Sequence, residues 1–175
     1  LIRLERVQHH EHIDLVASYL TDQIFDFQED AEGNLWIATW GGGLCKLASE
    51  YRDKVFSGAG KEVVFQRFTH ESANRQSVPS DLIKAFCLQH DTLMWMATRN
   101  GLTRFNPTLP SPAFFTYNPS ADNPYSIGSN NLTGVTLTPE NNLWITTWGD
   151  GLDYFDSHTG KFYHYRAQVN NPLSL

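Results

Sequence analysis

The chain is poor in cysteine and in positive charge, and it has no long hydrophobic run. Its 2 cysteines, Cys45 and Cys87, form no CxxC pair, which argues against a zinc site and leaves a disulfide between them as an open alternative. The 13 Lys and Arg residues are outnumbered by 19 Asp and Glu residues, for a net charge of −6. Without a basic cluster we expect no nucleic-acid partner, because a phosphate backbone is bound through grouped Lys and Arg.

The sequence also lacks the signals of a membrane segment. No stretch of about eighteen apolar residues occurs, and the N-terminus has no charged, apolar and small-residue pattern. We therefore expect no direct membrane contact from this chain. A hydrophobic content of 41% and an aromatic content of 13% nevertheless predict a folded domain with a real core.

What the chain has instead is one segment repeated three times. The copies read NLWIATWGGGL, LMWMATRNGL and NLWITTWGDGL, at residues 34–44, 93–102 and 142–152. Each contains a Trp, an apolar residue, a Thr and a glycine turn in the same order, and the tryptophans recur at intervals of about 50 to 60 residues. These tryptophans are Trp36, Trp95 and Trp144. The pattern identifies a repeat protein.

Each copy lies in a longer unit of four short strand-like segments, which in the second unit are residues 83–88, 93–98, 102–105 and 114–117. They are rich in β-branched and aromatic residues, and turns containing Gly and Asn separate them, whereas no segment shows a helical stripe. A single sheet of this kind cannot bury both faces, so neighbouring sheets must bury each other. The sequence therefore predicts an all-β fold, a fragment of a β-propeller built from four-stranded antiparallel blades.

The predicted organisation is three full blades and part of a fourth, cut from a longer array. The full blades span residues 24–69, 83–117 and 132–165, with a partial blade in residues 1–23 and the start of a loop to a further blade in residues 166–175. Because the end sheets of such a piece lack their neighbours, we expect it to self-associate.

Two repeated side chains have expected structural roles. The large tryptophans should form the core between adjacent blades, where burying one aromatic contributes about 1.5 to 3 kcal/mol. The threonines three residues later should bond backbone groups of the glycine turn. These threonines are Thr39, Thr98 and Thr147.

The repeat resembles a known family, the two-component regulator propeller repeat. The resemblance rests on GNLWIATWGGGL at residues 33–44, its two sibling copies, and loops of the form N-x-x-S-aliphatic-x-S such as NRQSVPS at residues 74–80. It implies a non-catalytic periplasmic sensor region of a membrane-bound histidine kinase, often a hybrid kinase, and sometimes of a diguanylate cyclase. The second copy departs from its siblings, with Met94 and Arg99 where they have Leu and Trp.

Candidate binding residues come from turn positions that differ between the copies. The turn opens with Trp40, Arg99 and Trp148, and it continues with Asn100 in the second copy and Asp150 in the third. In four-stranded propellers these turns surround the mouth of the central channel. Indole faces can stack on sugar rings, while Arg and Asp bind polar substituents, so we expect a small-molecule or oligosaccharide ligand. The alternative is that the two tryptophans merely pack against a neighbouring loop.

No metal, cofactor or catalytic group is predicted. His9, His10 and His12 form the segment HHEH, but no second ligand cluster accompanies them, so a solvated loop is expected. The remaining histidines are scattered, with no nucleophile or carboxylate that spacing identifies as a partner. Three functions stay open: a ligand sensor, a propeller lyase similar to the streptogramin lyases, and a protein-interaction scaffold.

Overall fold

The computed structural model describes residues 23–51, 65–90, 92–109 and 112–175. These residues form three antiparallel sheets of four strands each, which confirms the all-β propeller prediction. The predicted partial blade, including His9, His10 and His12, lies outside the described residues apart from Gln23. Both cysteines are free thiols, so no disulfide joins Cys45 and Cys87.

The strands follow one another across each sheet in chain order. The first sheet holds β1 (Ile24–Glu29), β2 (Leu35–Thr39), β3 (Leu44–Leu47) and β4 (Phe65–Phe68), with a short 3₁₀ helix, η1 (Ser49–Tyr51), after β3. The second holds β5 (Ile83–Gln89), β6 (Leu93–Thr98), β7 (Gly101–Phe105) and β8 (Phe115–Tyr117). The third holds β9 (Leu132–Leu137), β10 (Leu143–Thr147), β11 (Leu152–Asp156) and β12 (Lys161–Tyr165).

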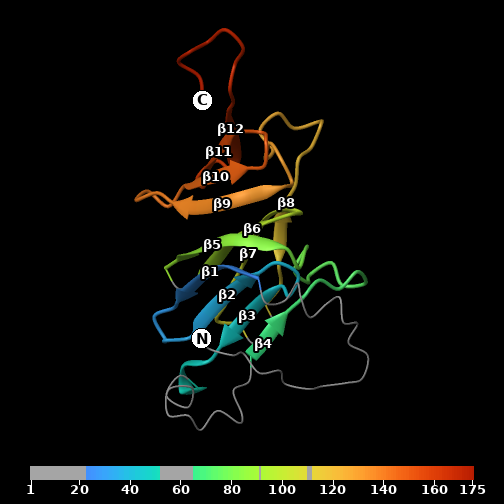
Figure 1. The fold of residues 1–175 in the computed structure, drawn as a ribbon, viewed down its shortest axis with the longest axis vertical. Helices are drawn as coiled ribbons and strands as arrows, with labels where there is room; N and C mark the ends of the chain where they lie inside the picture. The colour runs from blue at the N-terminus through green and yellow to red at the C-terminus, as the bar shows by residue number, and fades with distance from the viewer. Residues whose placement is uncertain (1–22, 52–64, 91, 110–111) are drawn as a thin grey trace.

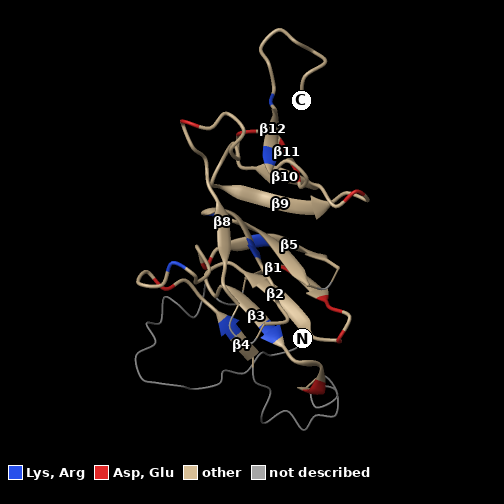
Figure 2. Cartoon of the chain, turned by 180° about the vertical axis from the view of Figure 1, so that it is seen from behind, with Lys and Arg blue, Asp and Glu red and all other residues tan. Residues whose placement is uncertain are grey.

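The three sheets are stacked along the long axis of the molecule, from the blue first sheet to the orange third sheet (Figure 1). The first strand of each sheet packs against the sheet before it: β5 contacts β1 and β2, and β9 contacts β5 and β6. The strands β1, β5 and β9 therefore follow one another along one edge of the stack, which corresponds to the channel side of a propeller. Lys and Arg positions alternate with Asp and Glu positions over the sheets and loops of the described part of the chain (Figure 2).

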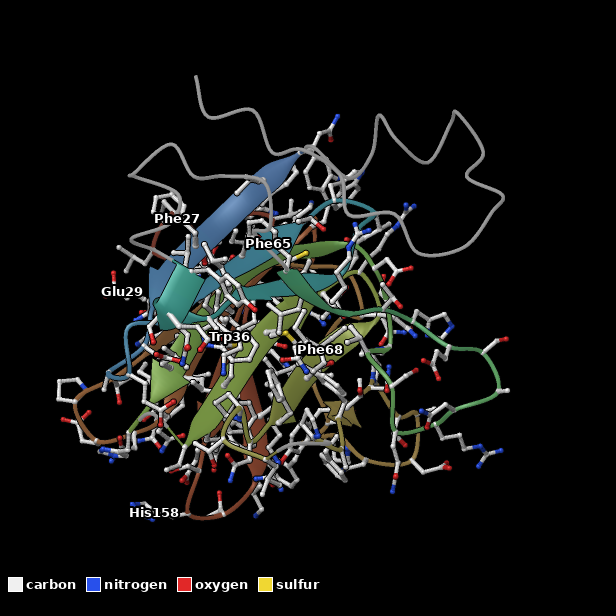
Figure 3. All side chains as sticks on the ribbon, turned by 90° about the horizontal axis from the view of Figure 1, so that it is seen from below. Phe27, Glu29, Trp36, Phe65, Phe68 and His158 are labelled. Atoms are coloured by element: carbon white, nitrogen blue, oxygen red, sulfur yellow. The ribbon has the colours of Figure 1, made fainter. Side chains whose placement is uncertain are left out.

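A repeated aromatic contact joins each sheet to the next. Trp36 on β2 is 0% exposed, and its ring lies 5.8 Å from that of Phe105 on β7. Trp95 on β6 is 3% exposed, and its ring lies 5.5 Å from that of Phe155 on β11. Trp36 and Phe68 point into the space between the first two sheets in Figure 3. Because both tryptophans reach the third strand of the following sheet, one contact type sets the spacing between blades.

Trp144 differs from its two siblings. It is only half-buried, and its ring packs 4.8 Å from Tyr154 and 5.6 Å from Tyr165 of its own sheet. The reason is that no fourth sheet among the described residues packs against its outer side. Phe27 on β1 is likewise 68% exposed, at the other end of the stack. Self-association through these end faces stays a prediction.

The repeated threonines hold the glycine turns, as predicted. Thr98 Oγ1 donates to the Gly101 carbonyl at 2.8 Å and accepts from the Asn100 N–H at 3.0 Å. Thr39 and Thr147 make the same pair of bonds in their own turns. Gly101 has a φ of 104°, and a Cβ there would come within 2.4 Å of the Tyr117 carbonyl oxygen, so this turn requires glycine.

Burial of Cys45 and partial burial of Cys87 favour the protonated form of both thiols. Burial raises the pKa of Cys45, and burial together with the nearby Asp26 carboxylate raises the pKa of Cys87 to about 12. The thiolate is the form that reacts with alkylating agents, so neither thiol is an effective nucleophile in the folded chain.

Replacing Trp95 by Ala should lower the free energy of unfolding by about 3 to 5 kcal/mol, because it leaves a large cavity between two sheets. The matched substitution Trp144→Ala should cost clearly less, since that ring is half-buried. Chemical denaturation followed by circular dichroism measures both. Equal losses would show that contact with the following sheet does not determine how much the tryptophan contributes to the free energy of unfolding.

Alkylation by iodoacetamide at pH 9 should be slow for both thiols until denaturant is added. An exposed thiol loses its proton near the ordinary pKa of 9.0, whereas the folded Cys87 keeps it up to about 12. The same difference predicts that stability falls as the pH rises above 9.0, because only the unfolded chain then loses the proton. Mass spectrometry of the labelled chain checks the first point, and rapid labelling without denaturant would contradict it.

Candidate ligand-binding site

The turns between the second and third strands lie against the loop that leads into the next sheet. The N–H groups of Gly41 and Gly43 donate to the Asp81 carbonyl at 2.9 and 3.1 Å. The N–H of Gly101 makes the equivalent bond to the Asn130 carbonyl at 2.8 Å. These bonds place the turns and the loops on one face of the stack.

The three turn residues chosen from the sequence occupy equivalent places on this face. In each sheet the N–H of the turn residue donates to the carbonyl of the residue that precedes the innermost strand. The pairs are Trp40 with Gln23 at 2.9 Å, Arg99 with Leu82 at 3.0 Å and Trp148 with Asn131 at 2.8 Å. The backbone thus presents one side chain from each blade at the same position, an indole in the first and third and a guanidinium in the second.

Lys84, which the sequence analysis did not select, brings the two tryptophans together. Its Nζ lies 5.1 Å from the ring centroid of Trp40 and 4.4 Å from that of Trp148. Both distances fall within the range of about 6 Å for attraction between a cation and an aromatic face. Trp148 is 68% exposed, so most of its surface is open to solvent rather than packed against a loop. Residues from all three blades therefore meet at one ammonium group.

A β-bulge explains how Lys84 reaches both rings. The pairing of β5 with β6 shifts between Ile83 and Ala85, which leaves Lys84 as the extra residue. Bulges bend a strand and redirect a side chain. The first and third sheets have the same irregularity, at Phe25 and at Thr133.

The three bulged residues form a second variable row beside the turn residues. The Phe25 ring lies 5.5 Å from the Trp40 ring, and Thr133 Oγ1 donates to Thr146 Oγ1 at 2.8 Å. A three-way comparison of the repeats could have found this row, since Phe, Lys and Thr stand at one aligned position.

The other predicted site residues do not join the tryptophan pair. Asn100 Nδ2 donates to the Pro79 carbonyl at 3.3 Å, which ties it to the adjoining loop. Arg99 is exposed, and neither Arg99 nor Asp150 makes a side-chain hydrogen bond, ion pair or ring contact with any described residue. Arg99 lies on the turn of the second sheet and Asp150 on the turn of Trp148, and both side chains are free to meet a ligand.

The polar residues of the loops between blades mainly serve the loops themselves. Asn74 Oδ1 accepts from the Gln76 N–H at 3.0 Å, and Ser77 Oγ donates to the Asn74 carbonyl at 2.8 Å. Both bonds recur in the loop at residues 171–174. In the loop between them Asn123 Oδ1 accepts from the Tyr125 N–H in the same way, whereas Ser126 Oγ donates to the Ser120 carbonyl at 3.2 Å. The repeated N-x-x-S residues therefore stabilise the loops that contain them. The turn face is a better candidate for ligand binding than these loops.

The described residues contain no group of three His, Cys, Asp or Glu side chains that could hold a metal ion. The nearest approach to catalytic geometry is His164 Nδ1, 2.7 Å from Oδ1 of the buried Asp153. Asp153 Oδ2 also accepts from the Gly128 N–H at 2.7 Å. This pair lies on β11 and β12, and it contacts the loop that leads into β9 through Gly128. No helix in the described part of the chain is long and apolar enough to cross a membrane.

Comparison with known proteins agrees with this architecture. Residues 18–41 match the family model described as two component regulator propeller. This segment of the chain carries the two component regulator propeller repeat. No curated protein sequence matches the chain.

Two solved structures share the fold of this repeat protein. The extracellular domain assigned to the hybrid two component system BT3049 of B. thetaiotaomicron matches 83% of the chain at 25% identity, with a TM-score of 0.65. PorZ, a surface component of the type-IX secretion system of Porphyromonas gingivalis, matches 86% at 16% identity, with a TM-score of 0.61. The second likeness shows the fold alone. The chain spans 18% and 22% of the lengths of these two structures.

A virginiamycin B lyase from Staphylococcus aureus is a weaker match. It aligns with 86% of the chain and 57% of its own length at 13% identity, with a TM-score of 0.40. A likeness at that level gives the lyase alternative no support.

Proposed function

We propose that the chain is part of the periplasmic ligand-sensing propeller of a two-component sensor histidine kinase, and that it is not itself catalytic. The repeat and the likeness to an extracellular domain of a hybrid two component system support the sensor role. The observation that carries ligand binding is the contact of Lys84 with both Trp40 and Trp148. Side chains from three blades converge there, on a face where each turn is held by the same pair of threonine bonds.

The chemistry of this face suits a small molecule or an oligosaccharide. The exposed ring of Trp148 offers a flat apolar surface on which a sugar ring can stack. Asp150 on the same turn and Arg99 on the turn of the second sheet offer polar contacts. Binding changes the output only if the ligand has different affinities for two arrangements of the receptor. The role of the propeller is then to supply that difference in affinity.

Replacing Trp40, Arg99 and Trp148 together by Ala in the intact sensor should abolish the response to its inducer without unfolding the propeller. The fold should survive because Trp148 and Arg99 are exposed. A reporter gene measures the response, and circular dichroism of the purified propeller checks the fold.

A matched control removes exposed aromatics elsewhere: Phe115→Ala with Tyr163→Ala, on the outermost strands β8 and β12. This control should respond normally. A normal response from the triple variant would place the binding site away from the turn face.

A further inference from the structure

We propose that Lys84 makes the turn face selective for ligands that carry an anionic group, such as a carboxylate or a sulfate ester. This inference rests on the proposed function, because it assigns a ligand class to the same site. It goes further in naming the residue that would determine specificity.

The first argument is that the ammonium group of Lys84 is held but not neutralised. Two indole rings flank it, at 5.1 and 4.4 Å, yet no described carboxylate forms an ion pair with it. Acidic residues outnumber basic ones by 19 to 13 in this chain, so carboxylate partners for a lysine are plentiful and Lys84 nevertheless has none among the described residues. Ring faces attract a cation but accept its N–H groups only weakly, which leaves these donors available to an anion.

The second argument is that the fold does not need a lysine at this position. The same bulge forms around Phe25 in the first sheet and around Thr133 in the third. Those residues have neither the charge nor the length of lysine. The backbone geometry therefore does not depend on Lys84, and its charge calls for another explanation.

The third argument concerns acidic side chains of the segments that adjoin Lys84. Asp26 Oδ2 accepts from the Phe86 N–H at 2.9 Å, and Asp81 Oδ1 accepts from the His70 N–H at 2.6 Å. Both carboxylates are thus engaged by backbone donors. Asp150, on the turn of Trp148, makes no ion pair with a described residue. A ligand anion would meet Lys84 without first displacing a protein carboxylate.

The contact between Lys84 and Trp148 also restricts the orientation of such a ligand. Nζ lies 4.4 Å from the centre of the Trp148 ring, so a sugar that packs against the exposed part of this indole can direct an acidic substituent past the ring edge to the ammonium group. An acidic substituent gains a charge-assisted hydrogen bond there, and a neutral one gains much less. Selectivity follows from this difference.

The test measures the binding of paired glycans, namely acidic oligosaccharides and their methyl-esterified or desulfated counterparts, on an array with the full chain. The wild type should bind acidic members and bind the neutral counterparts at least about tenfold more weakly, as expected for losing a hydrogen bond to a charged group. Lys84→Met should lose this preference and Lys84→Arg should keep it. Higher salt should weaken the wild-type signal.

Trp148→Ala serves as the companion variant, because it removes the stacking surface and keeps Lys84. It should weaken binding of acidic and neutral members alike. Equal binding of both members of a pair by the wild type, with loss in Trp148→Ala, would overturn the anion selectivity and leave the proposed function standing. If the wild type binds no member of any pair, both the anion selectivity and the proposed function are overturned. The same holds if Trp148→Ala and Lys84→Met bind the glycans as the wild type does.

Discussion

The contact between a tryptophan and an aromatic ring of the following sheet is the interaction on which the rest of the structure depends. A four-stranded sheet with two apolar faces is not stable alone, so each blade must be covered by its neighbour. Trp36 meets Phe105 and Trp95 meets Phe155 in the same way. This fixed spacing brings the inner strands close enough for the first and third blades to contact one residue of the second.

Structural and variable roles are divided between residues within each repeat. Threonine and glycine determine the path of each turn, and the N-x-x-S residues close each loop, so these are the same in every copy. The residue that opens the turn and the residue at the bulge have no such structural role. The first is Trp, Arg and Trp in the three copies, and the second is Phe, Lys and Thr. A binding face can therefore change its chemistry without changing the fold.

The charge of the candidate site is opposite to that of the chain as a whole. The chain has a net charge of −6, yet the group at the centre of the tryptophan pair is an ammonium. Aromatic rings rather than carboxylates surround it. That choice of partners holds the lysine in place without neutralising its charge, which is a suitable arrangement for receiving an anionic ligand.

The sequence by itself determined the strands, because alternation, β-branched residues and turn chemistry act over a few residues. The four segments predicted in the second unit agree with β5 to β8 to within one residue at each end. It also determined the role of Thr98, whose partners lie two and three residues away. The alignment of Trp40, Arg99 and Trp148 at one turn position came from the repeat alone.

Only the tertiary structure decided which of these residues meet. Trp40 and Trp148 come from blades that are not neighbours in the chain, and they converge on Lys84 because sheet packing and a bulge place it between them. The half-burial of Trp144 likewise depends on which sheet lies next to it, not on its own segment. Both results are set by contacts between residues far apart in sequence, for which a local pattern carries no signal.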